Sequence, residues 1–422
     1  MRRDQPRLRR IPQPIPSLPD LAMRSPRLVQ FALLFACAVM GSCTPNDSRL
    51  TTHAPTIDTL PNGAIHVVNT GPTAWADTNG WRLVLERTIA PAPGEPGELG
   101  EPRDIVVDSR GNILVADYDE GPVIKRFGPD GTFLGQFGRR GSGPGEFQNA
   151  ALMITRDTLV IHDSRQARTS TFTADGTFLQ TWTSLCCEQR PLLAGDGVAP
   201  VPGMIKPDTT SNTQGRLMSG SGAIWYALDG SVRDTTIFPP QPEQPVWRMG
   251  DQNDWSINTI PYTAGIRGRF APDGRYYWGL QGSYRIVVTR TGHDTLRIIE
   301  GVPPTPATIP ESLRVEQIER YHRQDERWRA VAKLEDIPTT WPMWSSFVVD
   351  QSNHLWVLLP GPRGEGEYWD VFDPDGVLLG RVPAPFDQLW RTFWGSDRVY
   401  QVTENPQTEL PEIRVWRVER GG

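Results

Sequence analysis

A ten-residue phrase that occurs early in the chain returns near its C-terminus. Residues 106–115 read VVDSRGNILV and residues 348–357 read VVDQSNHLWV, so two apolar runs flank a polar turn in both copies. A Pro-Asp-Gly turn follows each copy, beginning at Pro129 in the first and at Pro374 in the second. Alternating strands joined by Asp-Gly form β-hairpins. The chain is therefore predicted to be a repeat protein built from short antiparallel strands.

The repeat unit has about 45 to 50 residues and four short strands, so it cannot bury both faces of its sheet alone and its copies must stack. For strands the usual outcome is a propeller. The predicted fold class is thus all-β, a six-bladed β-propeller of four-stranded blades. The six predicted units lie at about residues 102–137, 151–182, 223–238, 268–299, 346–382 and 392–418.

The last unit lacks one strand, because the chain ends after the third. At the other end, residues 81–89 (WRLVLERTI) alternate like a strand but have no hairpin partner nearby. An unpaired edge strand is an aggregation hazard, and pairing these two segments removes it. We therefore expect the N-terminal strand to complete the sixth blade and close a propeller that spans residues 81–420.

One segment departs from the strand pattern and predicts a helix between the fourth and fifth blades. Residues 311–335 are charged and contain no Gly or Pro, and Thr308 and Glu311 have the spacing of a capping box with Pro310 in the first turn. This predicts a helical insertion at about residues 308–336, which either rests on the propeller face or forms a lid or partner surface. Its apolar stripe consists of Val315, Ile318, Tyr321, Trp328 and Val331.

The N-terminus has the features of an export signal. An apolar run at residues 28–40 follows Arg24 and Arg27 and is too short for a permanent membrane span. Residues 1–42 are therefore predicted to be a signal peptide. Met23 is the expected start of translation, because the charged, apolar and small-residue regions follow it in order; the alternative is that residues 1–22 are translated and disordered.

The end of this segment resembles a bacterial lipoprotein signal. Gly41 and Ser42 fit the small positions before Cys43, which the resemblance makes the lipid-bearing first residue of the mature chain. An ordinary cleaved signal is the alternative. Residues 43–80 are expected to be the anchor and a tether, and Thr44 after the cysteine is similar to the pattern of outer-membrane sorting. The predicted location is the cell envelope, on its periplasmic or surface face.

Charge narrows the range of partners. The chain has 43 basic and 49 acidic residues, and removing residues 1–42 takes away seven Arg and two Asp, which leaves a net charge of −11. Nucleic acid is therefore not an expected partner, and membrane contact is expected only through lipid on Cys43. We expect a monomer. Cys186 and Cys187 are adjacent, so a disulfide between them would be strained, and two thiols in a loop are the alternative.

The first predicted blade resembles the NHL repeat. The resemblance is carried by residues 102–117 (PRDIVVDSRGNILVAD), by the return at 124–131 (IKRFGPDG) and by the link at 138–147 (GRRGSGPGEF). Taken whole, the chain is similar to six-bladed β-propeller lipoproteins of bacterial envelopes. The resemblance implies the propeller but no single activity, because such propellers include binding scaffolds and enzymes.

Several carboxylates stand beside predicted inner strands. Asp104, Asp117, Asp163 and Glu404 could converge on Ca²⁺ at the channel mouth, as in lactonase-like propellers, which makes a calcium-dependent hydrolase or lyase the alternative function. The same Asp residues could instead cap turns. No zinc site is predicted, because no three of the six His residues occupy equivalent inner positions.

Arginine and tryptophan favour binding over catalysis. The chain has 15 Trp, and Arg and Trp dominate binding hot spots, although Trp also fills spaces between blades. We expect a module that binds a protein, peptide or carbohydrate ligand, with no catalytic residues and no cofactor. The expected channel-face site consists of Arg103, Asp104, Asp117, Asp163, Arg165, Arg267, Arg269 and Glu404.

Overall fold

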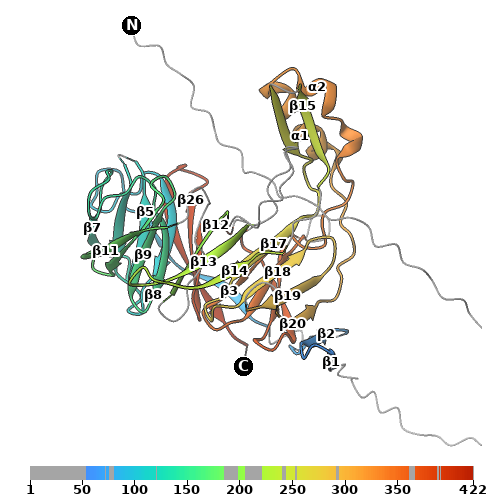
Figure 1. Cartoon of the computed structure of the whole chain (residues 1–422), viewed down its shortest axis with the longest axis horizontal. Coiled ribbons are helices and arrows are strands. Elements are labelled where there is room, and N and C mark those ends of the chain that lie inside the picture. The colour runs from blue at the N-terminus through green and yellow to red at the C-terminus, as the bar shows by residue number, and fades with distance from the viewer. Residues whose placement is uncertain are drawn as a thin grey trace, which may run out of the picture.

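The chain forms a six-bladed β-propeller, as the repeat predicts (Figure 1). In five blades the strands follow one another outward from the channel in sequence order, and the sixth combines both ends of the propeller. The computed structural model describes residues 54–71, 73–75, 80–119, 121–184, 198–204, 221–239, 244–251, 254–290, 294–360, 366–386, 389 and 391–421.

Blades 1, 2 and 5 are four-stranded antiparallel sheets in which consecutive strands pair. Blade 1 contains β4 (Pro102–Val107), β5 (Ile113–Asp117), β6 (Val123–Phe127) and β7 (Phe133–Phe137). Blade 2 contains β8 (Ala151–Thr155), β9 (Thr158–Asp163), β10 (Arg168–Thr173) and β11 (Phe178–Thr183). Blade 5 contains β21 (Ser346–Val349), β22 (Leu355–Leu359), β23 (Tyr368–Phe372) and β24 (Leu378–Pro383).

Blades 3 and 4 differ in size. Within the described residues blade 3 has three strands, whereas blade 4 has four and gains two more at its outer edge. Blade 3 contains β12 (Val198–Met204), β13 (Ser221–Ala227) and β14 (Val232–Ile237). Blade 4 contains β17 (Ile266–Phe270), β18 (Tyr276–Leu280), β19 (Arg285–Thr289) and β20 (Thr295–Glu300).

The sixth blade joins the two ends of the propeller. Its strands run in the order β25 (Thr392–Trp394), β26 (Arg398–Glu404), β27 (Pro411–Glu419) and β3 (Arg82–Ile89). β3 pairs antiparallel with β27 along nearly its whole length, from Arg82 opposite Glu419 to Ile89 opposite Ile413. The predicted closure by the N-terminal strand is therefore confirmed.

An N-terminal hairpin lies against the outside of blade 4. β1 (Thr56–Thr59) pairs with β2 (Ile65–Val68), and β2 runs parallel to β20. Asn69 then donates hydrogen bonds to the carbonyls of Glu300 and Gly376, which belong to blades 4 and 5. The range expected to be a tether thus contains a segment docked on the rim, because Val67 and its neighbours cover the outer strand of blade 4.

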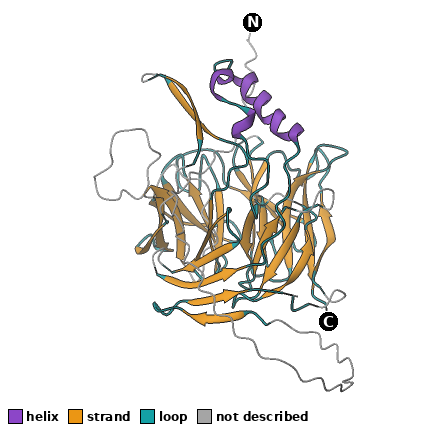
Figure 2. Cartoon of the chain, turned by 90° about the vertical axis from the view of Figure 1, so that its right-hand side faces the viewer, coloured by secondary structure: helices purple, strands orange, loops and turns teal. Residues whose placement is uncertain are grey.

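The helical insertion packs against a hairpin that precedes blade 4. The insertion consists of α1 (Glu311–Gln324), α2 (Trp328–Val331) and η1 (Leu334–Asp336), and the hairpin of β15 (Val246–Gly250) and β16 (Trp255–Thr259). Side chains of α1, α2 and β15 form one apolar cluster, which Ile260 and Ile337 complete. Figure 2 shows this accessory module projecting from one side of the propeller. The predicted capping box does not form, because Pro310 is the N-cap and Thr308 bridges to Thr340.

Aromatic and aliphatic side chains fill the spaces between blades. Strand residues alternate between the two faces of a blade, so each blade contributes to two cores. Between blades 5 and 6 this core includes Trp356, Trp369 and Trp394, none more than 2% exposed. Much of the tryptophan content therefore serves packing. Among the described residues, no helix has the length and apolarity needed to cross a membrane.

Candidate functional site

A pocket of about 950 Å³ lies at the end of the propeller where the first and second strands of the blades are joined, which we call the turn face. Turns from five blades line it: residues 108–111 of blade 1, 155–157 of blade 2, Pro272 of blade 4, Gln351 of blade 5 and 395–398 of blade 6. The remaining lining residues are Glu86, Arg87, Val107, Pro129, Asp130, Ile154, Phe393, Tyr400 and Val415.

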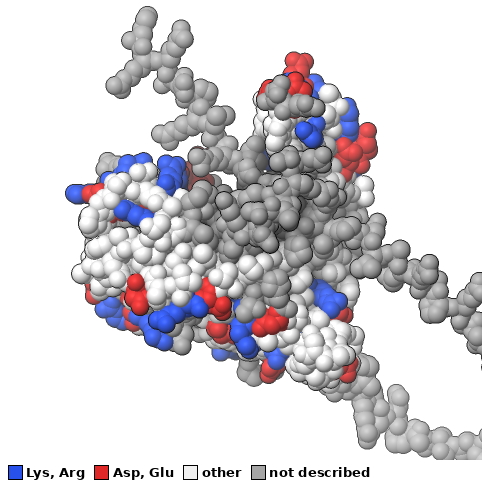
Figure 3. Space-filling model, in the orientation of Figure 1, with Lys and Arg blue, Asp and Glu red and all other residues white. Residues whose placement is uncertain are grey.

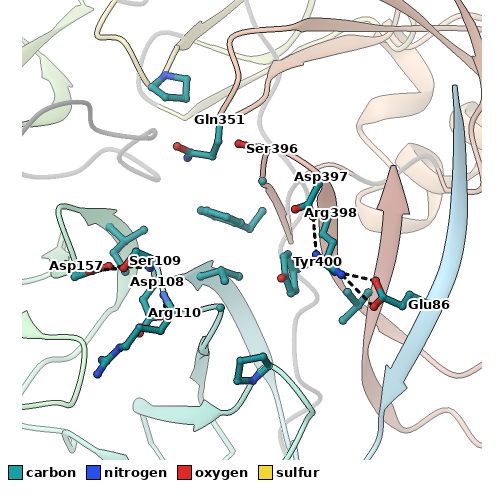
Figure 4. Close-up of a pocket in the computed structure, with 18 of the residues that line it drawn as sticks. Glu86, Asp108, Ser109, Arg110, Asp157, Gln351, Ser396, Asp397, Arg398 and Tyr400 are labelled. Carbon is teal, nitrogen blue, oxygen red and sulfur yellow. Dashed lines mark hydrogen bonds and ion pairs between the residues drawn. The ribbon is translucent and has the colours of Figure 1, made fainter. Parts of the chain in front are cut away.

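On one wall of the pocket, one arginine is paired with two carboxylates. Nε of Arg398 lies 2.8 Å from Oε2 of Glu86, and its Nη1 lies 2.6 Å from Oδ2 of Asp397 (Figure 4). The hydrogen bond from Arg398 lowers the pKa of Glu86. This guanidinium is therefore held by two protein carboxylates.

On the opposite wall, two carboxylates accept hydrogen bonds from the turns between strands. Asp108 accepts hydrogen bonds from the N–H groups of Arg110 (2.9 Å) and Asn112 (2.8 Å), which folds the first turn of blade 1. Asp157 accepts the N–H and the hydroxyl of Ser109, at 2.8 and 2.5 Å, which ties blade 2 to blade 1. The hydrogen bond from the Ser109 hydroxyl lowers the pKa of Asp157 most, and the bond from the Ser109 N–H lowers it further.

The turn that carries Asp157 is strained. Arg156 and Asp157 join β8 to β9 with φ of 47° and 58°, a left-handed conformation that glycine and asparagine favour. Such a conformation costs roughly 1–2 kcal/mol for each ordinary residue. The hydrogen bonds to Ser109 stabilise it, and strain that the surroundings maintain is common at binding sites.

Uncharged groups remain for a ligand. In the described part of the chain, the side chains of Gln351, Ser396 and Tyr400 form no hydrogen bond, and Figure 4 shows all three at the pocket. Burial raises the pKa of Tyr400, so its hydroxyl is a neutral donor at physiological pH. Phe393 lies edge-on to Tyr400, with ring centroids 6.2 Å apart. The pocket therefore offers an aromatic surface, an amide and hydroxyls.

None of the eight residues expected to form the site lines this pocket, because most of them lie at the other end of the blades. Asp117, at the end of β5, accepts the N–H groups of Gly100 (3.0 Å) and Glu101 (2.7 Å) and pairs with Lys125 at 2.7 Å. Asp163 has the same position in blade 2 and accepts the N–H of Gln148 at 2.7 Å. Both carboxylates therefore anchor the loops that connect blades.

Two further expected residues belong to the first blade. Asp104 is 8% exposed, and its Oδ2 accepts the N–H of Leu152 at 2.9 Å, which links the innermost strands of blades 1 and 2. Arg103 is exposed, pairs with Glu101 at 2.7 Å and lies over the ring of Tyr118 at 4.3 Å. The structure thus brings Arg103, Asp104 and Asp117 together at one end of blade 1.

The other expected residues are dispersed. Arg165 is exposed after β9, and Glu404 is exposed at the end of β26 in blade 6. Arg267 and Arg269 are partly buried on β17, the innermost strand of blade 4. Cys43, Cys186 and Cys187 lie outside the described residues.

The carboxylates do not converge on a cation. Within the described residues, no group of three or more His, Cys, Asp and Glu side chains is arranged to hold a metal ion. The carboxylates of Asp104, Asp117 and Asp163 serve the backbone instead, so the donor set does not favour the calcium-dependent hydrolase. Lys, Arg, Asp and Glu are interspersed on the face drawn in Figure 3, without a large patch of one sign.

A scan of protein-family models finds no match to the sequence, and a search of curated proteins finds none either. Among solved structures, a DUF4221 member from Bacteroides vulgatus is 14% identical with a TM-score of 0.47, covering 81% of this chain and 99% of that one. Virginiamycin B lyase from Staphylococcus aureus is 12% identical with a TM-score of 0.39, covering 80% and 100%. Similarities this low transfer no activity, ligand or metal.

Proposed function

We propose that the protein is an exported, lipid-anchored propeller that binds a carbohydrate in the turn-face pocket and does not catalyse a reaction on it. The proposal rests on one observation: charged side chains of the lining pair with one another, whereas some uncharged polar side chains of the described lining do not. In the Glu86–Arg398–Asp397 cluster the charged groups pair with one another, whereas in the described part of the chain the side chains of Gln351 and Tyr400 retain unused hydrogen-bonding groups. Such a lining favours an uncharged polar ligand.

The pocket also has a size and surface suited to a sugar. A volume of about 950 Å³ is at the upper end of small-molecule sites and can hold several sugar rings. Tyr400 supplies an apolar ring for the C–H face of a sugar, and the amide of Gln351 can donate and accept. A peptide segment is the competing ligand, and the experiment below separates the two.

The anchor is the second part of the proposal. Lipid on Cys43 would attach the chain to the membrane, and only 12 residues separate that cysteine from β1 at the rim of blade 4. Radiolabelled palmitate should be incorporated by the wild type and not by Cys43→Ser, and the variant should leave the membrane fraction. Incorporation into Cys43→Ser would refute this part.

Binding is tested with the folded chain on parallel glycan and peptide arrays, followed by calorimetry with the best glycan. Tyr400→Ala and Gln351→Ala should each weaken glycan affinity about tenfold, equivalent to about 1.4 kcal/mol. Arg165→Ala, exposed and outside the pocket, is the matched control and should bind like the wild type. Selective binding of peptides, or glycan binding unaffected by both pocket variants, would contradict the proposal.

A further inference from the structure

We propose a second binding site, for an oxyanion, at Arg267 on the channel side of blade 4. This site is separate from the turn-face pocket and does not depend on the function proposed for it. The ligand class is defined by a carboxylate or phosphate group that a guanidinium can bind through two parallel hydrogen bonds.

Arg267 lies on the strand nearest the channel. Among the described strands β17 pairs only with β18, so no described strand pairs with its other edge, which faces the centre of the ring. Arg267 is opposite Gly279 in the register, and the pocket residue Pro272 follows the far end of β17. The arginine is therefore set back from the turn face by the length of the strand.

No described side chain supplies a counter-charge to the guanidinium of Arg267. In the described part of the chain it forms no hydrogen bond and no ion pair. Other arginines of blade 4 differ: Arg275 pairs with Asp273, and Nη2 of Arg297 lies 2.9 Å from Asp375. Burial lowers the pKa of Arg267, and no acidic side chain offsets the effect.

A partly buried cation without a counter-ion is unfavourable, and arginine stays charged at any physiological pH. The groups nearest to the paired position Gly279 supply one backbone carbonyl and no carboxylate. A Cβ at Gly279 would lie 2.5 Å from the carbonyl oxygen of Arg285, 2.9 Å from Cδ1 of Ile286 and 3.1 Å from Cζ2 of Trp344. An oxyanion from outside would supply the missing charge.

A second arginine strengthens the local field. Residues two apart in a strand point to the same face about 7 Å from one another, so Arg269 lies beside Arg267 on the face that also carries Tyr277. Arg269 has interactions of its own and is not required to bind the ligand directly. Its charge still raises the potential that an anion experiences at Arg267.

The test measures the Tm of the full chain in phosphate, sulfate, acetate or galacturonate and compares it with the Tm in chloride. All solutions have the same ionic strength. An anion bound only by the folded state should raise Tm by roughly 2 °C or more in the wild type. Arg267→Met should abolish this increase. Arg285→Met, which removes an exposed arginine of the same blade, is the control for net charge and should keep it.

The four anions also distinguish which class of ligand the site binds. A response to phosphate and sulfate indicates a phosphorylated ligand, and a response to acetate and galacturonate indicates a carboxylate, including an acidic sugar. Arg267→Lys retains the charge but loses the bidentate geometry, so its Tm should rise less than that of the wild type. This variant keeps the test informative if the Met variant fails to fold. No shift in the wild type, or equal shifts in wild type and Arg267→Met, would overturn the inference.

Discussion

Ile89, the last residue of the strand that closes the ring, lies directly against Gly131 in the third turn of blade 1. A Cβ at position 131 would be 2.9 Å from Cγ1 of Ile89, a separation that real Cβ atoms essentially never show. Gly131 also has a φ of 91°, which side chains rarely adopt. This glycine therefore serves both the turn and the contact between the sixth and first blades.

The same contact recurs around the ring. In each case a side chain from the outer strand of one blade lies against the turn glycine of the next blade. The further pairs are Phe137 with Gly176, Trp182 with Gly230, and Ile299 with Gly376. The Asp-Gly turns thus determine blade-to-blade packing as well as hairpin geometry, because only glycine leaves room for the preceding blade.

Gly131→Ala should destabilise the protein by about 2–4 kcal/mol, from backbone strain together with overpacking against Ile89. Gly63→Ala is the matched control, because Gly63 has a similar φ of 82° but nothing within 4 Å of the added Cβ. It should cost only the strain, about 1–2 kcal/mol. Urea unfolding measures both values. Equal losses in the two variants would show that the contact contributes nothing.

The fold could be predicted from sequence because its signals are local. Asp-Gly turns, alternating strands and the strand missing from the last blade each lie within a short segment, and together they define six blades and the closure. The helix that begins at Glu311 could also be predicted, but the hairpin that it packs against could not. The β15–β16 ribbon belongs to another insertion, and no periodicity links the two.

The pocket could not be predicted in the same way. It is assembled from turns of five blades that are far apart in sequence, and the turn residues Asp108 and Gln351 were part of the repeat that indicated the fold. The sequence analysis instead assigned the carboxylates at strand ends to a binding site on the channel face. Sequence pattern does not distinguish a carboxylate that binds backbone N–H groups, such as Asp163, from one that faces a ligand.

Deleting residues 81–89 should abolish cooperative folding, because β27 then loses its outer partner from Ile413 to Glu419 and becomes an exposed edge strand. Deleting residues 54–68 is the matched control. It removes the β1–β2 hairpin, which adds to a blade that already has four strands, so this variant should fold with a reduced Tm. Circular dichroism melts and size-exclusion chromatography report both outcomes. A soluble, cooperatively melting 81–89 deletion would refute closure by β3.

Asp117→Asn should lower stability by about 1–3 kcal/mol at pH 7, since a buried acceptor of backbone N–H groups loses its charge. Burial by itself raises the pKa of Asp117, but hydrogen bonds from Lys125 and from Gly100 and Glu101 lower it below 3.8 overall. The stabilisation is therefore present above pH 3.8 and lost as pH falls through the folded-state value.

Urea titrations at pH 7 and pH 3 test this prediction. The difference between wild type and Asp117→Asn should shrink at the lower pH, because below pH 3.8 the unfolded wild-type chain binds a proton at this carboxyl more readily than the folded protein does. Asp58→Asn, on the exposed hairpin strand β1, should leave stability within about 0.5 kcal/mol at both values. A difference that does not change with pH would show that charge is not the cause.

His162 should make the protein sensitive to mild acid. It is 1% exposed in β9, its Nδ1 lies 3.2 Å from Oγ1 of Thr169, and burial lowers its pKa to about 4, although Asp163 partly opposes the shift. Between pH 6.5 and 4 the unfolded chain binds a proton there that the folded protein does not. Stability should fall over that window by roughly 3 kcal/mol in total.

His162→Gln removes the titrating group while keeping a polar side chain of similar length beside Thr169. Other carboxylates titrate in both proteins, so the informative quantity is the difference between wild type and variant, measured by urea unfolding at intervals from pH 7 to 4. That difference should favour the wild type most at pH 7 and decline toward pH 4. A parallel pH dependence in the two proteins would show that His162 accepts a proton in the fold at its ordinary pKa.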